Sequence, residues 1–319
     1  MSAMRSIPEI LRSLSPIKKV FILGSAFVDV VIRVPQMPHS GGDLEGECRT
    51  TSVGGCSYNV ADVLAKLGLP FEALMPVGEG MIADIVTKAF KERGYPIRLY
   101  SGHGDNGWCL SLVEPHGERT FVSMFGIERR MSPEWFDSVP IEDFDLIYLS
   151  GYQAEGENGA VVLEALKRKR PDADLIFDPG PRAMEIDPAR MSAFLSLGTV
   201  LTVNAQEARA MTRESSAEAA ARALSHRTGR PAVVTDGSRG AVLAEGDVVR
   251  LIEGYPVDVV DTIGSGDSHT GGFIAARMCG LPLEESVRFA NAVASVVTGR
   301  EGAATAPTAE ELLAIHSGK

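Results

Sequence analysis

Short, continuously apolar runs alternate along the chain with longer segments whose apolar residues recur every three or four positions. The first apolar run covers residues 19–24, and a helical pattern follows at 57–67. Unbroken apolar runs are typical of strands buried on both faces of a parallel sheet. Further strands are predicted at 71–77, 145–150, 174–178, 199–203 and 232–235, and further helices at 81–93, 157–169, 188–196, from Ala205, at 266–279 and at 283–298. This alternation predicts an α/β fold with a mainly parallel sheet flanked by helices.

Two segments, at about 30–53 and 106–125, depart from this alternation. The second holds two short strand-like runs around a Pro-His-Gly-Glu turn, which favours a hairpin over a helix. The first lacks helical periodicity. We therefore predict that the two segments form a small β-sheet lid. The lid belongs to one domain at 19–319, and residues 1–18 form an N-terminal extension to which the sequence assigns no role.

Composition and charge narrow the classes of function. Hydrophobic residues make up 45% of the chain and charged residues 23%, which is ordinary globular usage. The formal net charge of −11 argues against a general binder of nucleic acid or anionic membranes, because such surfaces need basic side chains. The four cysteines lie far apart without a C-x-x-C pair, as is typical of free thiols in a reducing compartment. With no signal-peptide-like core, the sequence predicts a cytoplasmic protein.

A glycine-rich turn between a β-branched run and a helix carries the candidate chemistry. Gly264 and Gly266 flank Ser265, and Asp267 follows directly. Glycines allow successive backbone N–H groups to converge on one point, and the next helix adds its positive N-terminal end, so this segment can hold anionic oxygens. A carboxylate beside such a site can accept a proton from a hydroxyl that attacks a phosphate. The alternative from these residues alone is a tight turn with an Asp helix cap.

The segment Asp261-Thr262-Ile263-Gly264-Ser265-Gly266-Asp267 closely resembles the D-T-x-G-A-G-D signature of the ribokinase (PfkB-type) carbohydrate and nucleoside kinases. Four other segments resemble family motifs in the same order: Gly24-Ser25 through Asp29, Gly54-Gly55-Cys56-Ser57-Tyr58-Asn59-Val60-Ala61, the Asn204 and Glu207 pair, and Thr235-Asp236-Gly237-Ser238-Arg239-Gly240. Together the five segments cover about residues 19–308. A sixth segment, 178–182, resembles D-x-N-x-R but has Gly180 in place of the Asn, so the role of that Asn is not carried over.

The resemblance implies a doubly wound α/β body with a β-sheet lid, and transfer of the ATP γ-phosphoryl group to a hydroxymethyl oxygen. It makes Asp267 the general base, with the anion hole formed by Gly264, Ser265 and Gly266. The residues implied to bind the substrate hydroxyls are Asp29, Gly55 and Asn59. Those implied to lie near the nucleotide are Asn204, Glu207, Thr235, Gly237, Gly240 and Asn291, with Glu207 organising Mg²⁺ through water. Asp261 and the Ile263 carbonyl are the implied ligands of a monovalent cation such as K⁺.

Three functions remain open from the sequence. The first is an ATP-dependent sugar kinase, and the second is a nucleoside kinase of the same family. Phe27 bears on this choice because ribokinases carry Asn there; its ring can stack on a nucleobase, exclude a sugar hydroxyl, or simply pack at a strand end. The third function is a sugar-binding regulator without catalysis, against which the retained Asp267 argues. The lid also predicts a homodimer, because an exposed apolar sheet commonly needs a cover.

Overall fold

The main sheet of the computed structural model, which describes residues 5–100 and 102–317, has eight strands. Their order is β14-β13-β12-β11-β10-β9-β1-β4. The strands are β1 (Val20–Leu23), β4 (Glu72–Leu74), β9 (Leu146–Ser150), β10 (Asp174–Asp178), β11 (Thr199–Asn204), β12 (Ala232–Thr235), β13 (Gly240–Glu245) and β14 (Val248–Glu253). All pairs from β12 to β4 are parallel, whereas β13 and β14 add an antiparallel hairpin. The predicted α/β fold with a mainly parallel sheet is confirmed.

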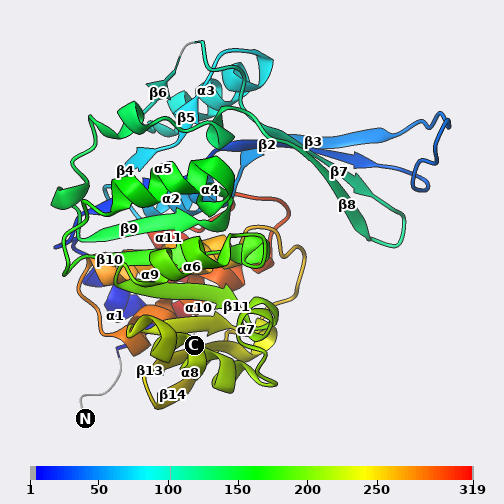
Figure 1. Ribbon diagram of the computed structural model, residues 1–319. Helices are drawn as coiled ribbons and strands as arrows, with labels where there is room; N and C mark the ends of the chain where they lie inside the picture. The colour runs from blue at the N-terminus through cyan, green and yellow to red at the C-terminus, as the bar shows by residue number, and fades with distance from the viewer. Residues whose placement is uncertain (1–4, 101, 318–319) are drawn as a thin grey trace.

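Helices cover both faces of this sheet (Figure 1). One face carries α4 (Gly151–Ala154), α5 (Gly156–Leu166), α6 (Pro188–Leu195), α7 (Ala205–Thr212) and α8 (Ala217–Thr228). The other carries α1 (Ile7–Arg12), α2 (Cys56–Lys66), α9 (Ser265–Met278), α10 (Leu283–Thr298) and α11 (Ala309–Ser317), with α3 (Met81–Arg93) at its edge. A hydrophobic core lies on each face of the sheet, and strand β1 contributes side chains to both. Val20 and Ile22 lie in one core, and Phe21 and Leu23 lie in the other. The helices make the sheet doubly wound.

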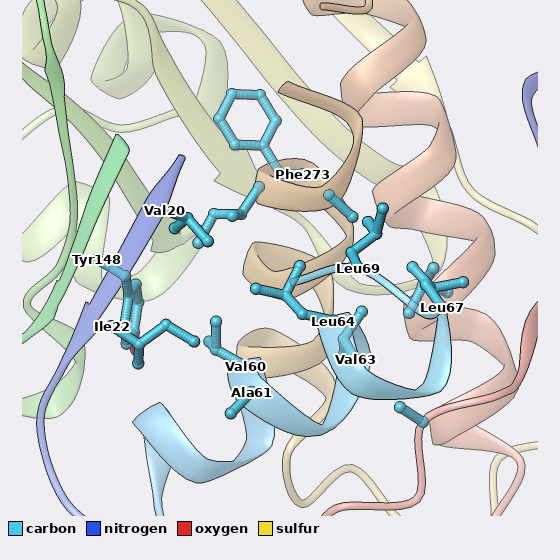
Figure 2. Close-up of a cluster of buried hydrophobic side chains, with 14 of the residues drawn as sticks. Val20, Ile22, Val60, Ala61, Val63, Leu64, Leu67, Leu69, Tyr148 and Phe273 are labelled. Atoms are coloured by element: carbon cyan, nitrogen blue, oxygen red, sulfur yellow. The ribbon is translucent and has the colours of Figure 1, made fainter. Parts of the chain in front are cut away.

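Helix α9 packs very closely between α2 and α10, because it presents glycines to both. A Cβ on Gly271 would lie 2.8 Å from the Val63 Cβ of α2, and a Cβ on Gly272 would lie 3.0 Å from the Ala290 Cα of α10. Figure 2 shows side chains of β1, α2 and α9, including Phe273, in the same buried cluster. Interiors packed at this density resist displacement of their elements. The position of α9, which begins at the glycine-rich turn, is therefore fixed by its neighbours.

A separate four-stranded sheet, the lid, has the order β3-β2-β7-β8 and projects from the body in Figure 1. Its strands are β2 (Phe27–Arg33), β3 (Glu47–Gly54), β7 (Trp108–Val113) and β8 (Arg119–Met124). The β2–β3 and β7–β8 pairs are antiparallel hairpins, and β2 joins them by pairing in parallel with β7. The predicted lid is present, with β2 beginning three residues before the predicted segment.

The strand predicted at 71–77 is in fact divided between two sheets. Its first part is β4 in the main sheet, and its second is β5 (Pro76–Val77), which pairs with β6 (Arg98–Leu99) in a small sheet of two strands. Pro76 lacks a backbone N–H and so cannot continue a full ladder. The chain therefore leaves the main sheet after Leu74.

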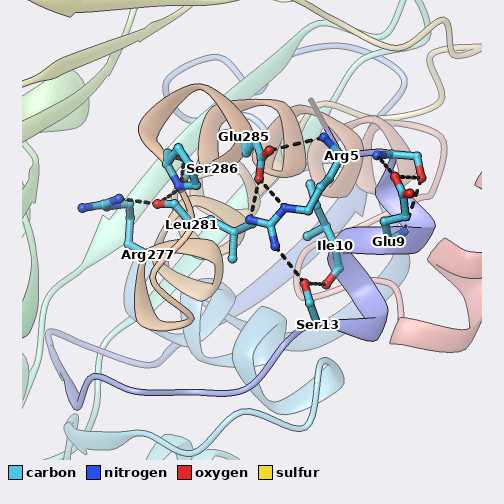
Figure 3. Close-up of polar contacts among 10 residues, drawn as sticks. Arg5, Glu9, Ile10, Ser13, Arg277, Leu281, Glu285 and Ser286 are labelled. Atoms are coloured by element: carbon cyan, nitrogen blue, oxygen red, sulfur yellow. Dashed lines mark hydrogen bonds and ion pairs between the residues drawn. The ribbon is translucent and has the colours of Figure 1, made fainter. Parts of the chain in front are cut away.

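Helix α1, within the predicted N-terminal extension, packs on the body. Ser6 and Glu9 form a reciprocal capping box, and Ile7 and Ile10 are buried in the core. Arg5 pairs with Glu285 of α10, with 2.6 Å between Nη2 and Oε2 (Figure 3). These contacts anchor residues 5–12. No helix within residues 5–100 and 102–317 is both long and apolar enough to cross a membrane.

Candidate functional site

The glycine-rich turn leads directly into α9 and leaves backbone donors free. Gly264 is the N-cap with φ +72°, a conformation that favours glycine, and Ser265 N donates to the Thr262 carbonyl. The N–H groups of Gly266 and Asp267 find no acceptor among the described residues. Such groups at a helix N-terminus form an anion-binding position.

Asp267 lies in the first turn of α9, and Asn59 of α2 orients its carboxylate. Asn59 Nδ2 donates to Asp267 Oδ2 over 2.7 Å, and the Cys56 thiol also hydrogen-bonds to this side chain. Burial raises the pKa of Asp267, and the hydrogen bonds from Asn59 and Cys56 lower it by less, so it remains above its usual value. A carboxylate with a raised pKa is a stronger base.

Asp267 lies where two cavities meet. A cavity of about 190 Å³ opens towards the carboxyl ends of β10 and β11, and a cavity of about 400 Å³ lies beneath the lid. A third cavity, of about 560 Å³, shares Gly266 and Thr235 with the first and lies beside α10. Clefts at the carboxyl ends of parallel strands are the usual ligand sites of open α/β sheets. We call these cavities the central, lid and α10 cavities.

The central cavity collects three carboxylates. Asp178 ends β10, Glu207 belongs to the first turn of α7, and Asp267 faces them. Burial and the charges of Asp267 and Glu207 raise the pKa of Asp178 well above its usual range, and burial, with Asp267, raises that of Glu207. Glu207 is fixed by a reciprocal capping box, in which its N–H donates to Asn204 Oδ1 over 2.9 Å. Grouped carboxylates whose charges repel each other are a suitable oxygen donor set for Mg²⁺.

The lid cavity is lined by polar side chains, one of which has an unused hydrogen-bond acceptor. Asp29 of β2 lines it, and burial together with the charge of Asp267 raises its pKa to about 6. The Asn59 Oδ1 is buried and has no hydrogen-bond partner within residues 5–100 and 102–317. Gly55 takes φ +97° immediately before α2, where a Cβ would lie 3.1 Å from the Ser25 carbonyl. A buried acceptor without a partner is costly, so this position favours a ligand that donates hydrogen bonds.

Aromatic rings form another wall of the lid cavity. The ring centroids of Phe27 and Phe125 are 5.8 Å apart, and those of Phe125 and Tyr152 are 6.3 Å apart. Phe121 and Phe125 keep 56% and 44% of their surface exposed, although both line the cavity. The Arg129 guanidinium lies 4.1 Å over the Phe125 ring. Exposed rings in a cavity offer apolar faces to a ligand.

The α10 cavity is lined by Thr235, Gly237, Gly240 and Asn291, together with Val257 and Val259. Asn291 is fully engaged, since its Nδ2 donates to the Ile252 and Glu253 carbonyls over 2.9 and 3.0 Å and its Oδ1 faces His269 Nε2. Burial lowers the pKa of His269 to about 4, so its ring is neutral at pH 7. The cavity thus combines glycine backbone with apolar side chains.

Asp261 lies outside these three cavities and contacts the lid. Its Oδ1 accepts from Ile263 N over 3.1 Å and from Arg119 Nη1 of β8 over 3.2 Å, and its Oδ2 accepts from Gly302 N over 3.2 Å. Together with Ile263 it lines a fourth cavity of about 520 Å³ that shares Asp29 and Phe121 with the lid cavity.

The structure brings the residues singled out in the sequence into three groups. The lid cavity is lined by Phe27, Asp29, Gly55, Asn59, Ile263, Gly264 and Asp267. The central cavity is lined by Asn204, Glu207, Thr235, Gly264, Gly266 and Asp267. The α10 cavity is lined by Thr235, Gly237, Gly240, Ser265, Gly266 and Asn291. The Ser265 hydroxyl is paired with Thr298 Oγ1 at 2.9 Å, so its side chain is engaged within the chain.

Several residues that line the site have no role predicted from the sequence. Asp178 and Tyr152 line the central cavity, and Cys56 lines both the central and lid cavities. Asp178 could have been found from its place at the end of a predicted strand. Cys56 stands within a family-like motif, but only the fold shows its thiol beside Asp267.

Comparisons with known proteins agree with this geometry. The model of the pfkB family carbohydrate kinase matches residues 17–310. The chain is 35% identical over 311 residues to the uncharacterised sugar kinase YegV of Escherichia coli K12, covering 96% of this chain and 97% of that protein. It is 27% identical over 304 residues to the ATP-dependent ribose-1-phosphate kinase of Halopiger xanaduensis, covering 94% and 98%. The crystal structure of ribokinase from Thermotoga maritima matches with a TM-score of 0.82 at 23% identity, covering 93% of this chain and 98% of that chain.

Proposed function

The chain belongs to the pfkB family of carbohydrate kinases, and we propose that it transfers the γ-phosphoryl group of ATP to a hydroxymethyl oxygen of a small sugar. The position of Asp267 carries this proposal. It lies between the lid cavity, which suits an acceptor, and the central cavity, which suits phosphates. The α10 cavity, with its glycines and exposed valines, suits the adenosine part of ATP.

In the proposed reaction, the acceptor hydroxyl binds near Asp29 and Asn59 and points at Asp267. The Asp267 carboxylate takes the hydroxyl proton as the oxygen attacks the γ-phosphate. The free N–H groups of Gly266 and Asp267 then stabilise the charge that develops on the phosphoryl oxygens. Gly264 allows the turn that directs these groups into the site.

Asp178 and Glu207 would hold Mg²⁺ in the central cavity, with Glu207 acting through water. When bound, the ion neutralises phosphate charge and orients the β- and γ-phosphates. The raised pKa values of both carboxyls support this assignment, because each is poised to gain from a nearby cation.

We predict that Asp178→Asn raises the Mg²⁺ concentration needed for half-maximal activity by about 10–100-fold, because one anionic partner of the ion is lost. The measurement is a Mg²⁺ titration of the initial rate at saturating ATP and acceptor. Glu185→Gln is the matched control, since that side chain is exposed nearby but lines none of the cavities. An unchanged Mg²⁺ dependence in Asp178→Asn would place the ion elsewhere.

A nucleoside is the second candidate acceptor, and the aromatic wall of the lid cavity supports it. Phe27, Phe121 and Phe125 can cover a nucleobase while Asp29 and Asn59 bind the ribose hydroxyls. Stacking of a base on an aromatic side chain contributes about 1–3 kcal/mol. A free sugar would leave Phe121 and Phe125 largely uncovered.

The deciding experiment is ADP release across a panel of pentoses, hexoses, sugar acids and nucleosides, with Asp267→Asn as the control. We expect a strong signal with one class of acceptor that collapses in the variant. Preference for nucleosides over their free sugars would favour the second candidate. If folded protein binds a sugar but releases no ADP with any acceptor, the chain is a non-catalytic sugar-binding regulator.

We also propose a homodimer formed through the lid. The sheet ends in two open edges, β3 and β8, and Val122 of β8 is 48% exposed. Uncovered edges with apolar side chains favour pairing with another sheet. Light scattering is expected to give twice the chain mass, and Val122→Lys is expected to reduce it to the mass of one chain. A single-chain mass for the wild-type protein at every concentration would exclude this dimer.

A cytoplasmic location is proposed on chemical grounds. All four cysteines are free in the structure, as is typical of reducing compartments. The proposed donor, ATP, is also most abundant there. Fractionation of cells that express the tagged protein tests this location.

A further inference from the structure

Arg119 and Asp261 join two parts of the molecule that are distant in sequence. Arg119 begins lid strand β8, whereas Asp261 lies 142 positions later, in the loop that leads into the glycine-rich turn. The Asp261 side chain is 6% exposed and that of Arg119 is 31% exposed, so the pair is largely shielded from water. A shielded pair between the lid and a loop of the body restrains how they move relative to each other.

The Asp261 carboxylate is fully engaged by donors. Ile263 N and Arg119 Nη1 both reach Oδ1, and Gly302 N reaches Oδ2. Burial raises the pKa of Asp261, but the hydrogen bonds from Ile263, Gly302 and Arg119 outweigh burial and hold the pKa below its usual value. The carboxylate is therefore ionised at neutral pH, and its negative charge is matched by the guanidinium.

A monovalent cation does not fit this arrangement. Its expected ligands are the Asp261 carboxylate and the Ile263 carbonyl, but Arg119 already neutralises the carboxylate. A second cation would lie beside the guanidinium, and two like charges in a shielded site repel each other strongly. Three other charged side chains, Arg33, Arg49 and Glu301, line the same cavity. In the described part of the chain none of them pairs with Asp261, and Arg49 pairs with Glu47 at 3.1 Å, so they do not change this balance.

We propose that Arg119 is a positioning residue that serves as a built-in cation for Asp261, so that the kinase works without potassium. The guanidinium holds the Asp261 carboxylate, whose Oδ1 also accepts from Ile263 N, and in this way it fixes the chain that enters Gly264. Because Arg119 belongs to the lid, the pair links the position of the lid to that of the anion-binding turn. The expected effect of salts on the reaction rate rests on the proposed function, whereas the expected binding of K⁺ to an Arg119 variant does not.

The kinetic test compares rates in KCl, NaCl and tetramethylammonium chloride at equal ionic strength. The wild-type enzyme is expected to give equal rates in all three salts. Arg119→Ala is expected to lose on the order of tenfold in kcat, because one partner of a shielded charge pair is removed. Its kcat is expected to recover in KCl or in dilute guanidinium chloride. Arg119→Lys should retain most of the activity. Arg49→Ala, which removes an arginine from the same cavity, is expected to behave like the wild type.

A second readout does not depend on catalysis. In thermal unfolding, KCl is expected to stabilise Arg119→Ala relative to tetramethylammonium chloride, because K⁺ binds the vacated carboxylate only in the folded protein. The wild type and Arg49→Ala should show no such difference. Potassium activation or stabilisation of the wild type would overturn the proposal, and so would an Arg119→Ala protein that responds to no cation. If every variant lacks kinase activity but the unfolding pattern holds, the proposed function fails, whereas the role of Arg119 as a built-in cation for Asp261 stands.

Discussion

Replacing Asp267 with Asn is expected to lower kcat by about 10²–10⁴-fold, the usual contribution of a general base. The amide keeps the shape of the carboxylate but cannot take the acceptor proton, so the loss falls on the chemical step. At 1.36 kcal/mol for each factor of ten, it corresponds to about 3–5 kcal/mol of transition-state stabilisation. Because burial raises the pKa of Asp267, its ionised form is unfavourable in the folded chain, and the neutral variant should unfold at no lower temperature.

The measurement is steady-state ADP release together with thermal unfolding. Asp258→Asn serves as the matched control, since Asp258 is an exposed carboxylate a few residues earlier and lines none of the cavities. The KM for ATP should change little, because the variant keeps the N–H groups of the turn. A kcat within about twofold of wild type would be far below the range of a base and would exclude that role for Asp267.

The second large effect is expected for Asp29→Asn. Hydrogen bonds to a charged acceptor contribute about 1.5–3 kcal/mol each, so losing the carboxylate should lower kcat/KM for the acceptor by about 10²-fold. Most of the change should be in KM, because in the proposed reaction Asp29 binds the acceptor and takes no part in the proton transfer. KM for ATP should remain unchanged, and a proportional loss for both substrates would indicate a general disturbance instead.

The pH dependence of the same variant gives an independent check. Burial and the charge of Asp267 raise the pKa of Asp29 to about 6, so in wild type KM for the acceptor should rise as pH falls through 6. In Asp29→Asn this rise should disappear. The stability of the fold shows the opposite trend. Between pH 3.8, the ordinary pKa of Asp, and about 6, the folded chain binds a proton that the unfolded chain does not, so stability falls as pH rises through this window. Asp29→Asn should therefore unfold at a higher temperature than wild type above pH 6.

The strand and helix pattern was predictable where apolar residues signal burial directly. The continuous runs of β1, β9, β10 and β12 lie within a residue of their predicted bounds because each is covered on both faces. Helix α8 was not predicted, since its buried face consists mainly of alanines, which give little contrast with polar positions. Strand β14 also lacked a signal, because it is an edge strand whose residues are only half-buried or exposed.

The candidate site was predictable only as far as its parts lie close in sequence. Gly264, Gly266 and Asp267 form one local motif, so their shared role follows from the chemistry of a turn before a helix. Contacts between distant segments carry no such local signal. Asn59 meets Asp267 across 208 positions and Arg119 meets Asp261 across 142, and only the packing of α9 and the lid brings these pairs together.

The placement of α9 between α2 and α10 also has a consequence for biosynthesis. Strand β1 and helix α2 emerge early from the ribosome, yet Gly271 and Gly272, which complete their cover, are made more than 200 residues later. Such long-range contacts slow folding, and incomplete chains expose apolar surface until the cover arrives. Nascent chains that end before residue 265 are therefore expected to depend on chaperones and to be readily degraded. Because the helix that covers β1 and α2 also carries Asp267, the protein gains its proposed catalytic group only when this cover is in place.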